Sequence, residues 1–397
     1  MKTIQKSLIC GLILCFLFIF NGPSLGAEKK PYKLGAIYSV TGGAALMGDP
    51  QKKTTEMLVD QINAAGGIDG HRLEVIIYDD ESDDTKARLL TTKLMKTEEV
   101  LGLLGPCATG TSMAAVDIAQ EYKCAMISMG ASWMITTDPK TNKVRYWVFK
   151  IPLDDKGCVA RIYEFLKYKG INKVATLTNT TAYGASGREA LFAMAPDYGI
   201  TILADEKFGP KDSDMTAQLT RIRVSGSQAI IGWTIGPTQT IIMRNWRDLG
   251  MTNIPFFQSF GFGNRKTIEL AAGAAEGINT LVTPGSVSTL LPDTHVQKKV
   301  TMEYTLAYEK KYNDRVSIFG GSASDALRLF VDALKKVGEK HTSLEASRKA
   351  IRDHLENTKG FVGQHGVFNF SPQHHMGLTK DAYVMVVIKS GDFALAK

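Results

Sequence analysis

Buried strands and helices alternate along most of the chain, and this alternation restricts its fold more than any other feature. Short apolar runs have the length expected of strands buried on both faces, and a segment with helical periodicity follows each of them. The first strands are expected at 33–39, 73–78, 100–104 and 125–128, and the helices between them at 48–63, 84–96 and 111–122. Such alternation predicts an α/β fold in which helices cover both faces of a parallel sheet.

A second series of the same kind begins at residue 155. Its strands are expected at 173–178, 201–207 and 229–233, and its helices at 155–169, 186–197, 216–224 and 238–249. The two series are joined by the short extended segment 145–153. One hydrophobic core rarely serves more than about 250–300 residues. We therefore expect two similarly built lobes.

The last third of the chain indicates two further crossings between the lobes. An extended segment at 274–285 precedes expected helices at 297–312, 322–336 and 343–358, and residues 366–370 and 381–389 alternate like an antiparallel pair of strands. We assign 28–151 and 282–359 to lobe 1, and 152–281 and 360–397 to lobe 2. Three crossovers would form a hinge about which the lobes can rotate.

The first 27 residues have the pattern of a secretory signal peptide. Lys2 and Lys6 precede an apolar run at 9–20, which is shorter than the roughly 20 residues that span a bilayer. Small residues permit cleavage near Gly26 or Ala27, so we expect an exported protein. The net charge is +7 for the full sequence and +5 without the two lysines. The remaining charges form no basic stripe, so no nucleic-acid partner is indicated.

Three cysteines follow the signal peptide, namely Cys107, Cys124 and Cys158. An oxidising compartment permits one disulfide and leaves one thiol over. Cys107 and Cys124 could pair, but we favour three buried free thiols.

The sequence contains no pattern that proposes a catalytic or metal site. The serine elbow, the phosphate-binding Walker loop and the His-Glu-x-x-His pair do not occur in it. The acids at 79–84 lack the spacing and the glycine of an EF-hand, and the adjacent His374 and His375 should point apart. We therefore predict a protein that is not an enzyme and that uses no cofactor or metal.

The loops that follow the predicted strands are the best candidates for a binding site, because open α/β sheets bind ligands outside the carboxyl ends of their strands. Thr109 is expected to cap a helix that begins at residue 110. The free amides of that helix could seat an anion without Arg or Lys. Gly130 and Ser132, in the next loop, would bring a flexible backbone and a hydroxyl to the same cleft. For Thr109, helix capping alone is the alternative interpretation.

Six short blocks keep a fixed order and spacing over residues 31–154. They are Leu34–Gly43, Asp60–Gly70, Val75–Asp80, Leu101–Ser112, Ala125–Ser132 and Tyr146–Asp154. The ordered set strongly resembles the branched-chain amino acid type (type I, Leu/Ile/Val-binding-like) of periplasmic solute-binding protein of an ABC transporter. The resemblance covers nearly the whole mature chain and is weakest in the last seventy residues.

The resemblance implies a two-lobed type I periplasmic-binding-protein fold and a periplasmic location. It also implies a monomeric receptor whose partner is a membrane permease with ATP-binding subunits. In the amino-acid receptors of this family, the positions matching Thr109, Gly130 and Ser132 hold the α-carboxylate of the ligand. Tyr183 and Asp154 also match the family pattern at their positions.

The side that holds the ligand's ammonium departs from the family pattern. The family's acidic residue falls on Phe260, and two expected tyrosines fall on Ile235 and Met47. An ammonium buried there without a partner would cost several kcal/mol. We therefore predict a small carboxylate without an amine, first of all a benzoate-like or phenylpropanoid acid. Trp133 and Trp233 flank the same loops and could stack on its ring, although each also fits a core position.

Three alternatives remain open. An aliphatic or branched-chain amino acid receptor would use Asp154 for the ammonium. A ligand-sensing regulator or receptor domain of the same fold would lack an export signal or add a signalling domain. An exported enzyme would need catalytic residues that the sequence does not propose.

Overall fold

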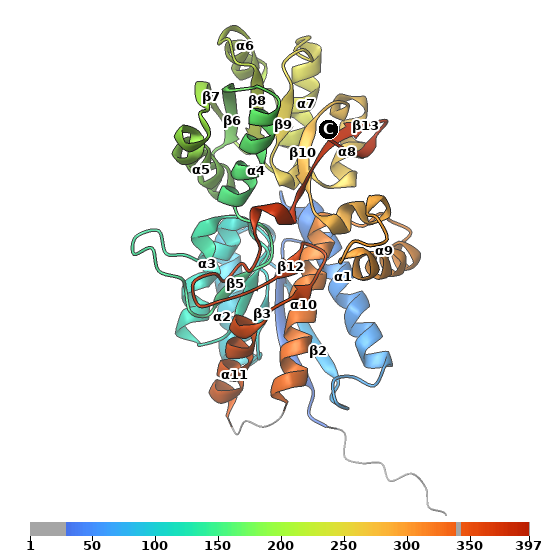
Figure 1. The fold of residues 1–397 in the computed structure, drawn as a ribbon. Coiled ribbons are helices and arrows are strands. Elements are labelled where there is room, and N and C mark those ends of the chain that lie inside the picture. Colours follow the sequence, from blue (N-terminus) through green and yellow to red (C-terminus); the bar gives the residue numbers. More distant parts are fainter. Residues whose placement is uncertain (1–28, 339–342, 397) are drawn as a thin grey trace, which may run out of the picture.

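The computed structural model describes residues 29–338 and 343–396, which form two lobes, each built around one β-sheet (Figure 1). The predicted two-lobed α/β fold is confirmed. The predicted signal peptide, residues 1–27, lies outside the described residues. Within the described part of the chain, no helix is long and apolar enough to cross a membrane.

The first sheet is parallel and has the strand order β2-β1-β3-β4-β5. Its strands are β1 (Tyr32–Tyr38), β2 (Leu73–Asp79), β3 (Leu103–Leu104), β4 (Met126–Ser128) and β5 (Val148–Lys150). The side chains of Leu104, Ile127 and Phe149 are completely buried, as expected for strands with helices on both faces. The sheet therefore supplies the core of lobe 1.

Six long helices belong to lobe 1, three from each end of the chain (Figure 1). They are α1 (Ala45–Ala64), α2 (Asp84–Thr92), α3 (Thr109–Glu121), α9 (Lys298–Tyr312), α10 (Ile318–Val337) and α11 (Leu344–Asn357). Helix α10 packs on α1 and α11. The buried guanidinium of Arg348 in α11 donates to the carbonyls of Val100, Tyr122 and Met95. These contacts attach the late helices to the early sheet.

The second sheet has the order β14-β13-β10-β9-β8-β6-β7, in which β13 is antiparallel to both of its neighbours, β10 and β14, and the other pairs are parallel. Its strands are β6 (Lys173–Asn179), β7 (Thr201–Phe208), β8 (Ala229–Trp233), β9 (Phe256–Gln258), β10 (Asn279–Val282), β13 (Val384–Lys389) and β14 (Asp392–Leu395). The helices of this lobe are α4 (Asp155–Tyr168), α5 (Ala182–Tyr198), α6 (Thr216–Val224), α7 (Thr238–Asp248) and α8 (Arg265–Ala271).

Short helical turns complete the described elements. A π-helical turn, η1 (Lys93–Thr97), continues α2, and the 3-10 helices are η2 (Trp133–Ile135), η3 (Phe260–Phe262), η4 (Ala272–Ala275), η5 (Pro284–Leu290) and η6 (Lys380–Ala382). The turns η2, η3 and η5 are the next elements after strands β4, β9 and β10.

The end of the chain pairs differently from the sequence-based expectation. Residues 366–370 and 381–389 do not form a pair. Instead, β12 (Val367–Phe368) pairs with β11 (Phe361–Val362), and β13 pairs with β10 and β14. The reason is local, because each strand finds its antiparallel partner across a tight turn. In the turn between β13 and β14, Ser390 and Gly391 both have positive φ.

The β11–β12 hairpin lies against α10 and not in the second sheet. Asp325 of α10 accepts the backbone amides of Gln364 and His365, and Arg328 donates to the carbonyl of Val362. The lobe boundaries stay a prediction. These contacts favour a return to the second lobe later than residue 360.

The three cysteines that follow residue 28 are buried free thiols, as predicted. The Sγ atom of Cys107 lies 3.0 Å from the hydroxyl oxygen of Ser39. Burial raises the pKa of the Cys107 thiol to about 12 and that of Cys124 to about 11. Both therefore remain protonated at neutral pH.

Candidate ligand-binding site

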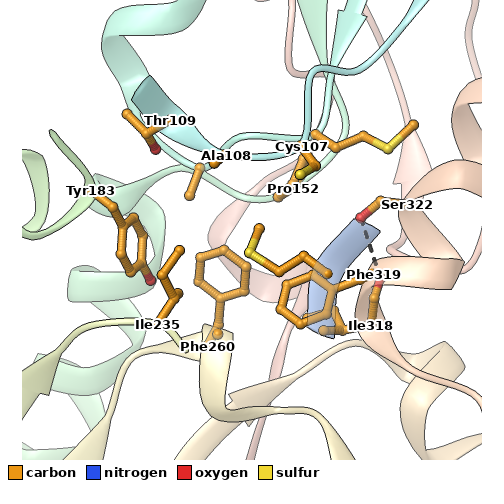
Figure 2. Close-up of a pocket in the computed structure, with 14 residues that line it drawn as sticks. Cys107, Ala108, Thr109, Pro152, Tyr183, Ile235, Phe260, Ile318, Phe319 and Ser322 are labelled. Carbon is orange, nitrogen blue, oxygen red and sulfur yellow. Dashed lines mark hydrogen bonds between the residues drawn. The ribbon is translucent and has the colours of Figure 1, made fainter. Parts of the chain in front are cut away.

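A cavity lies between the two lobes, at the carboxyl ends of strands from both sheets (Figure 2). Lobe 1 contributes residues from α1, from the loops after β3 and β4, and from the start of α10. The second lobe contributes the start of α5 and the loops after β8 and β9. The lining residues are Met47, Cys107, Ala108, Thr109, Met129, Ala131, Pro152, Tyr183, Ile235, Phe260, Gly261, Ile318, Phe319 and Ser322.

Five of the ten residues predicted from the sequence line this cavity, and five do not. The lining five are Met47, Thr109, Tyr183, Ile235 and Phe260. The other five are Gly130, Ser132, Trp133, Trp233 and Asp154, and each has a structural contact that explains its position.

Thr109 is the first residue of α3, and Ala108 is the N-cap, so the predicted capping role is wrong. The capping contact is made by Thr111, whose hydroxyl bonds to the backbone of Ala108. The side-chain oxygen of Thr109 is buried and has no hydrogen-bond partner among the described residues. A buried hydroxyl without a partner is costly. The Thr109 hydroxyl is therefore available to a ligand at the N-terminus of α3.

The loop after β4 lines the cavity with Met129 and Ala131, and not with the two predicted residues. The Ser132 hydroxyl accepts the amide of Met134 and lies 2.6 Å from the hydroxyl of Ser186 in α5. Gly130 is needed for packing, because a Cβ there would lie 2.7 Å from Cδ1 of Ile135. Both residues therefore shape the loop behind the cavity.

Aromatic rings form the wall of the cavity that belongs to the second lobe. The ring of Phe260 meets Tyr183 edge-on at 6.3 Å between centroids, and it meets Tyr383 edge-on at 5.8 Å. Such edge-to-face pairs are favourable aromatic geometries. Burial raises the pKa of Tyr183 well above its usual value, so this phenol stays neutral. Ile235 completes an apolar surface (Figure 2).

The two predicted tryptophans lie outside the lining of this cavity. Trp233 is completely buried, and its ring centroid lies 6.0 Å from that of Tyr183. A Cβ added to Gly187 would meet its indole at 2.1 Å. Trp133 is half-buried, and the ammonium of Lys156 lies 3.7 Å from its ring centroid. Trp233 therefore has the core position that the sequence also allowed, whereas Trp133 lies partly exposed beside Lys156.

Asp154 caps helix α4 through a 2.8 Å bond from the amide of Gly157. The next residue, Asp155, is completely buried and bonds to the Ser186 hydroxyl. Burial raises the pKa of Asp155 to about 7, although Ser186 and the charge of Lys150 lower it. Lys150 is also fully buried and donates to the carbonyls of Ala131 and Pro152. Burial lowers the pKa of Lys150 to about 8.

Sequence reasoning missed Asp155 and Lys150, and it missed the contribution of α10 to the cavity. An acid one position after a helix cap is usually explained by the helix dipole, so Asp155 gave no separate signal. Ile318, Phe319 and Ser322 belong to an apolar helix that reads as core. Only the packing of α10 against α1 brings them to the cavity.

No group of three His, Cys, Asp or Glu side chains in the described segments is placed to hold a metal ion. The acids near residue 80 serve local structure, since Asp83 caps α2 and Asp79 accepts the amide of Val40. His375 stacks on Phe149 at 4.2 Å between ring centroids.

Comparison with known proteins connects this geometry to a family. The profile of the family described as "Periplasmic binding protein" matches residues 31–392. A leucine-, isoleucine-, valine-, threonine- and alanine-binding protein of Pseudomonas aeruginosa is 27% identical over 322 residues, which are 81% of this chain and 82% of that protein.

Solved structures show the same fold. An extracellular ligand-binding receptor from Rhodopseudomonas palustris HaA2 has a TM-score of 0.85 and 26% identity, and the match covers 92% of this chain and 99% of that one. A solute-binding protein of an ABC transporter from R. palustris, solved in complex with benzoate, has a TM-score of 0.79 and 20% identity over 92% and 95% of the two chains.

Proposed function

We propose, from the premise that the chain belongs to the periplasmic binding protein family, that it is the substrate-binding component of an ABC importer. Its ligand would be a small carboxylate without an amine, first of all an aromatic acid of benzoate or phenylpropanoid type. The two lobes would close on this ligand, and the closed form would be presented to a membrane permease with its ATP-binding subunits.

The observation that carries this proposal is the chemistry of the cavity wall. None of the described lining residues carries a charge at neutral pH, and most are apolar. An α-amino acid would bring an ammonium into this space without a carboxylate to meet it, which costs several kcal/mol. Asp154 is committed to the cap of α4, and Asp155 bonds to Ser186 outside the lining.

The carboxylate of the ligand has a seat that requires no cation. The Thr109 hydroxyl can donate to it, and the first amides of α3 point toward the same end. On the other side, Phe260, Ile235 and Tyr183 offer apolar surface to a ring. Burying that ring contributes roughly 25 cal/mol per Å² of apolar surface removed from water.

A branched-chain amino acid remains the second candidate. The relative from P. aeruginosa is named for binding leucine, isoleucine, valine, threonine and alanine, and it matches most of the chain. In favour of the aromatic acid, the benzoate complex from R. palustris shows that a protein of this fold can hold such a ligand.

A thermal-shift screen of the purified mature protein separates the two candidates. Benzoate and 3-phenylpropionate should raise the melting temperature, because they carry a carboxylate and a ring but no amine. Leucine, isoleucine and valine should leave it unchanged. Benzyl alcohol is the matched control without the carboxylate and should also have no effect. Stabilisation by leucine, with none by the aromatic acids, would replace the proposal by the amino-acid receptor.

A further inference from the structure

A buried chain of three polar groups reaches the cavity from lobe 1. The Ser322 hydroxyl, which lines the cavity, lies 3.1 Å from Nε2 of His365. Nδ1 of the same imidazole lies 3.1 Å from a carboxylate oxygen of Asp325. The side chains of His365 and Asp325 are completely buried. Asp325 also accepts the amides of Gln364 and His365, at 2.6 and 2.9 Å.

The hydrogen bonds fix the direction in which Ser322 can act. A carboxylate only accepts hydrogen bonds, so Nδ1 of His365 carries a proton. In the neutral imidazole, Nε2 is then an acceptor, and Ser322 donates to it or to the Ile318 carbonyl at 3.2 Å. In the doubly protonated imidazole, Nε2 donates to Ser322 and the hydroxyl proton goes to Ile318. In both arrangements, the Ser322 proton has an acceptor within the protein, and a lone pair of the hydroxyl oxygen remains for a ligand.

The same order of groups activates a serine nucleophile in hydrolases, but that chemistry also needs free N–H donors beside the serine. Here the amides of Gly320 and Gly321 are bonded to the hydroxyl and carbonyl of Ser317. Ser322 itself bonds back to the carbonyl one turn earlier, as serines inside helices often do. The arrangement therefore fits a fixed hydrogen-bond acceptor.

Ser322 and Thr109 lie on opposite sides of the cavity, with Phe260 between them (Figure 2). The Thr109 hydroxyl has no partner and can donate to a carboxylate, whereas the Ser322 hydroxyl already has acceptors for its proton and offers a lone pair. We propose that Ser322 recognises a hydroxyl group at the end of the ligand remote from the carboxylate. This inference rests on the proposed function and narrows it, because the ligand class becomes hydroxy-substituted aromatic acids.

The surroundings of Ser322 make this recognition selective. Ile318 and Phe319 flank it in the lining and offer no side-chain hydrogen bond. A ligand hydroxyl at this end would meet Ser322, and an unsubstituted ring would leave the Ser322 lone pair buried without a partner. Sites built to bond a ligand hydroxyl discriminate strongly against analogues that lack it.

Calorimetry with benzoate and two para-substituted benzoates tests the proposal on the unaltered mature protein. 4-Hydroxybenzoate should bind roughly three- to tenfold more tightly than benzoate, as expected for one well-made hydrogen bond. 4-Methoxybenzoate carries an oxygen at the same place but cannot donate, so it should bind no better than benzoate. Equal affinity for the hydroxy and methoxy acids would overturn the proposal without any variant.

Ser322→Ala is the matching variant, and Ser324→Ala, a buried serine of the same helix outside the lining, is its control. The preference for 4-hydroxybenzoate over benzoate should fall to about one in Ser322→Ala and should persist in Ser324→Ala. A preference retained in folded Ser322→Ala would contradict the inference and leave the proposed function standing. If no aromatic acid binds and leucine does, the proposed function itself fails.

Discussion

The two walls of the cavity are built from different chemistry. The wall from lobe 1 contains apolar side chains as well, but it alone presents a helix N-terminus and two aliphatic hydroxyls, those of Thr109 and Ser322, at its two ends. The wall from the second lobe presents rings and an aliphatic side chain, among them Phe260 and Ile235. A carboxylate needs donors that are already in place, whereas a ring needs only surface that excludes water. The difference indicates that lobe 1 sets the orientation of the ligand and that the second lobe selects for its apolar body.

The strongest way to break this contrast is to place a charge in the apolar wall. Phe260→Glu should weaken the binding of an aromatic acid by about 3 kcal/mol or more, because a buried carboxylate would face that of the ligand without a partner. Glutamine is nearly the same size as glutamate but has no charge, so Phe260→Gln should lose much less binding affinity. Calorimetry with benzoate compares them. Equal losses in the two variants would mean that shape and not charge governs this wall.

A second prediction concerns the buried acid behind the cavity. Burial raises the pKa of Asp155 from its usual 3.8 to about 7, so between these values the folded protein holds a proton that the unfolded chain releases. Stability should therefore fall as the pH rises from about 4 to 7. In Asp155→Asn, the decrease in the free energy of unfolding over this pH range should be smaller by about 2–4 kcal/mol.

Urea unfolding across this pH range measures the effect. Asp154→Ala is the control, because it removes the cap of α4 at every pH, at a cost of about 1 kcal/mol, and should leave the pH dependence of stability unchanged. If wild type and Asp155→Asn give parallel curves, Asp155 is ionised in the folded protein.

The third prediction tests the role of Thr109 in the polar wall. Thr109→Ala should weaken ligand binding by about 1–3 kcal/mol, the value of a hydrogen bond to a charged group. Thr111→Ala, which removes the capping contact in the same turn, should lower the melting temperature and change affinity little. Unchanged affinity in folded Thr109→Ala would place the carboxylate elsewhere in the cavity.

The smallest expected effect is on molecular shape. If the two walls belong to lobes that rotate about the hinge, ligand should convert an open form into a more compact one. Small-angle X-ray scattering should then show a smaller radius of gyration with saturating ligand. Superimposable curves would argue against closure while leaving the fold unaffected.

The apolar side of the site could be predicted from the sequence. The resemblance to the amino-acid receptors places Phe260, Ile235 and Met47 in the cleft, each in a segment that follows a strand, and all three line the cavity. The polar residues were harder to predict. The loop after β4 does reach the cavity, as predicted, but it lines the cavity with Met129 and Ala131. The hydroxyl of Ser132 is hydrogen-bonded to that of Ser186 instead.

The sequence by itself determined the alternation of strands and helices and the two-lobed fold, because hydrophobic periodicity is a local property. The tertiary structure alone decided which side chains meet. The Ser322–His365–Asp325 chain joins residues 43 positions apart in sequence, and it forms only because the β11–β12 hairpin lies on α10. No local pattern records such a contact, since it depends on how separate elements pack.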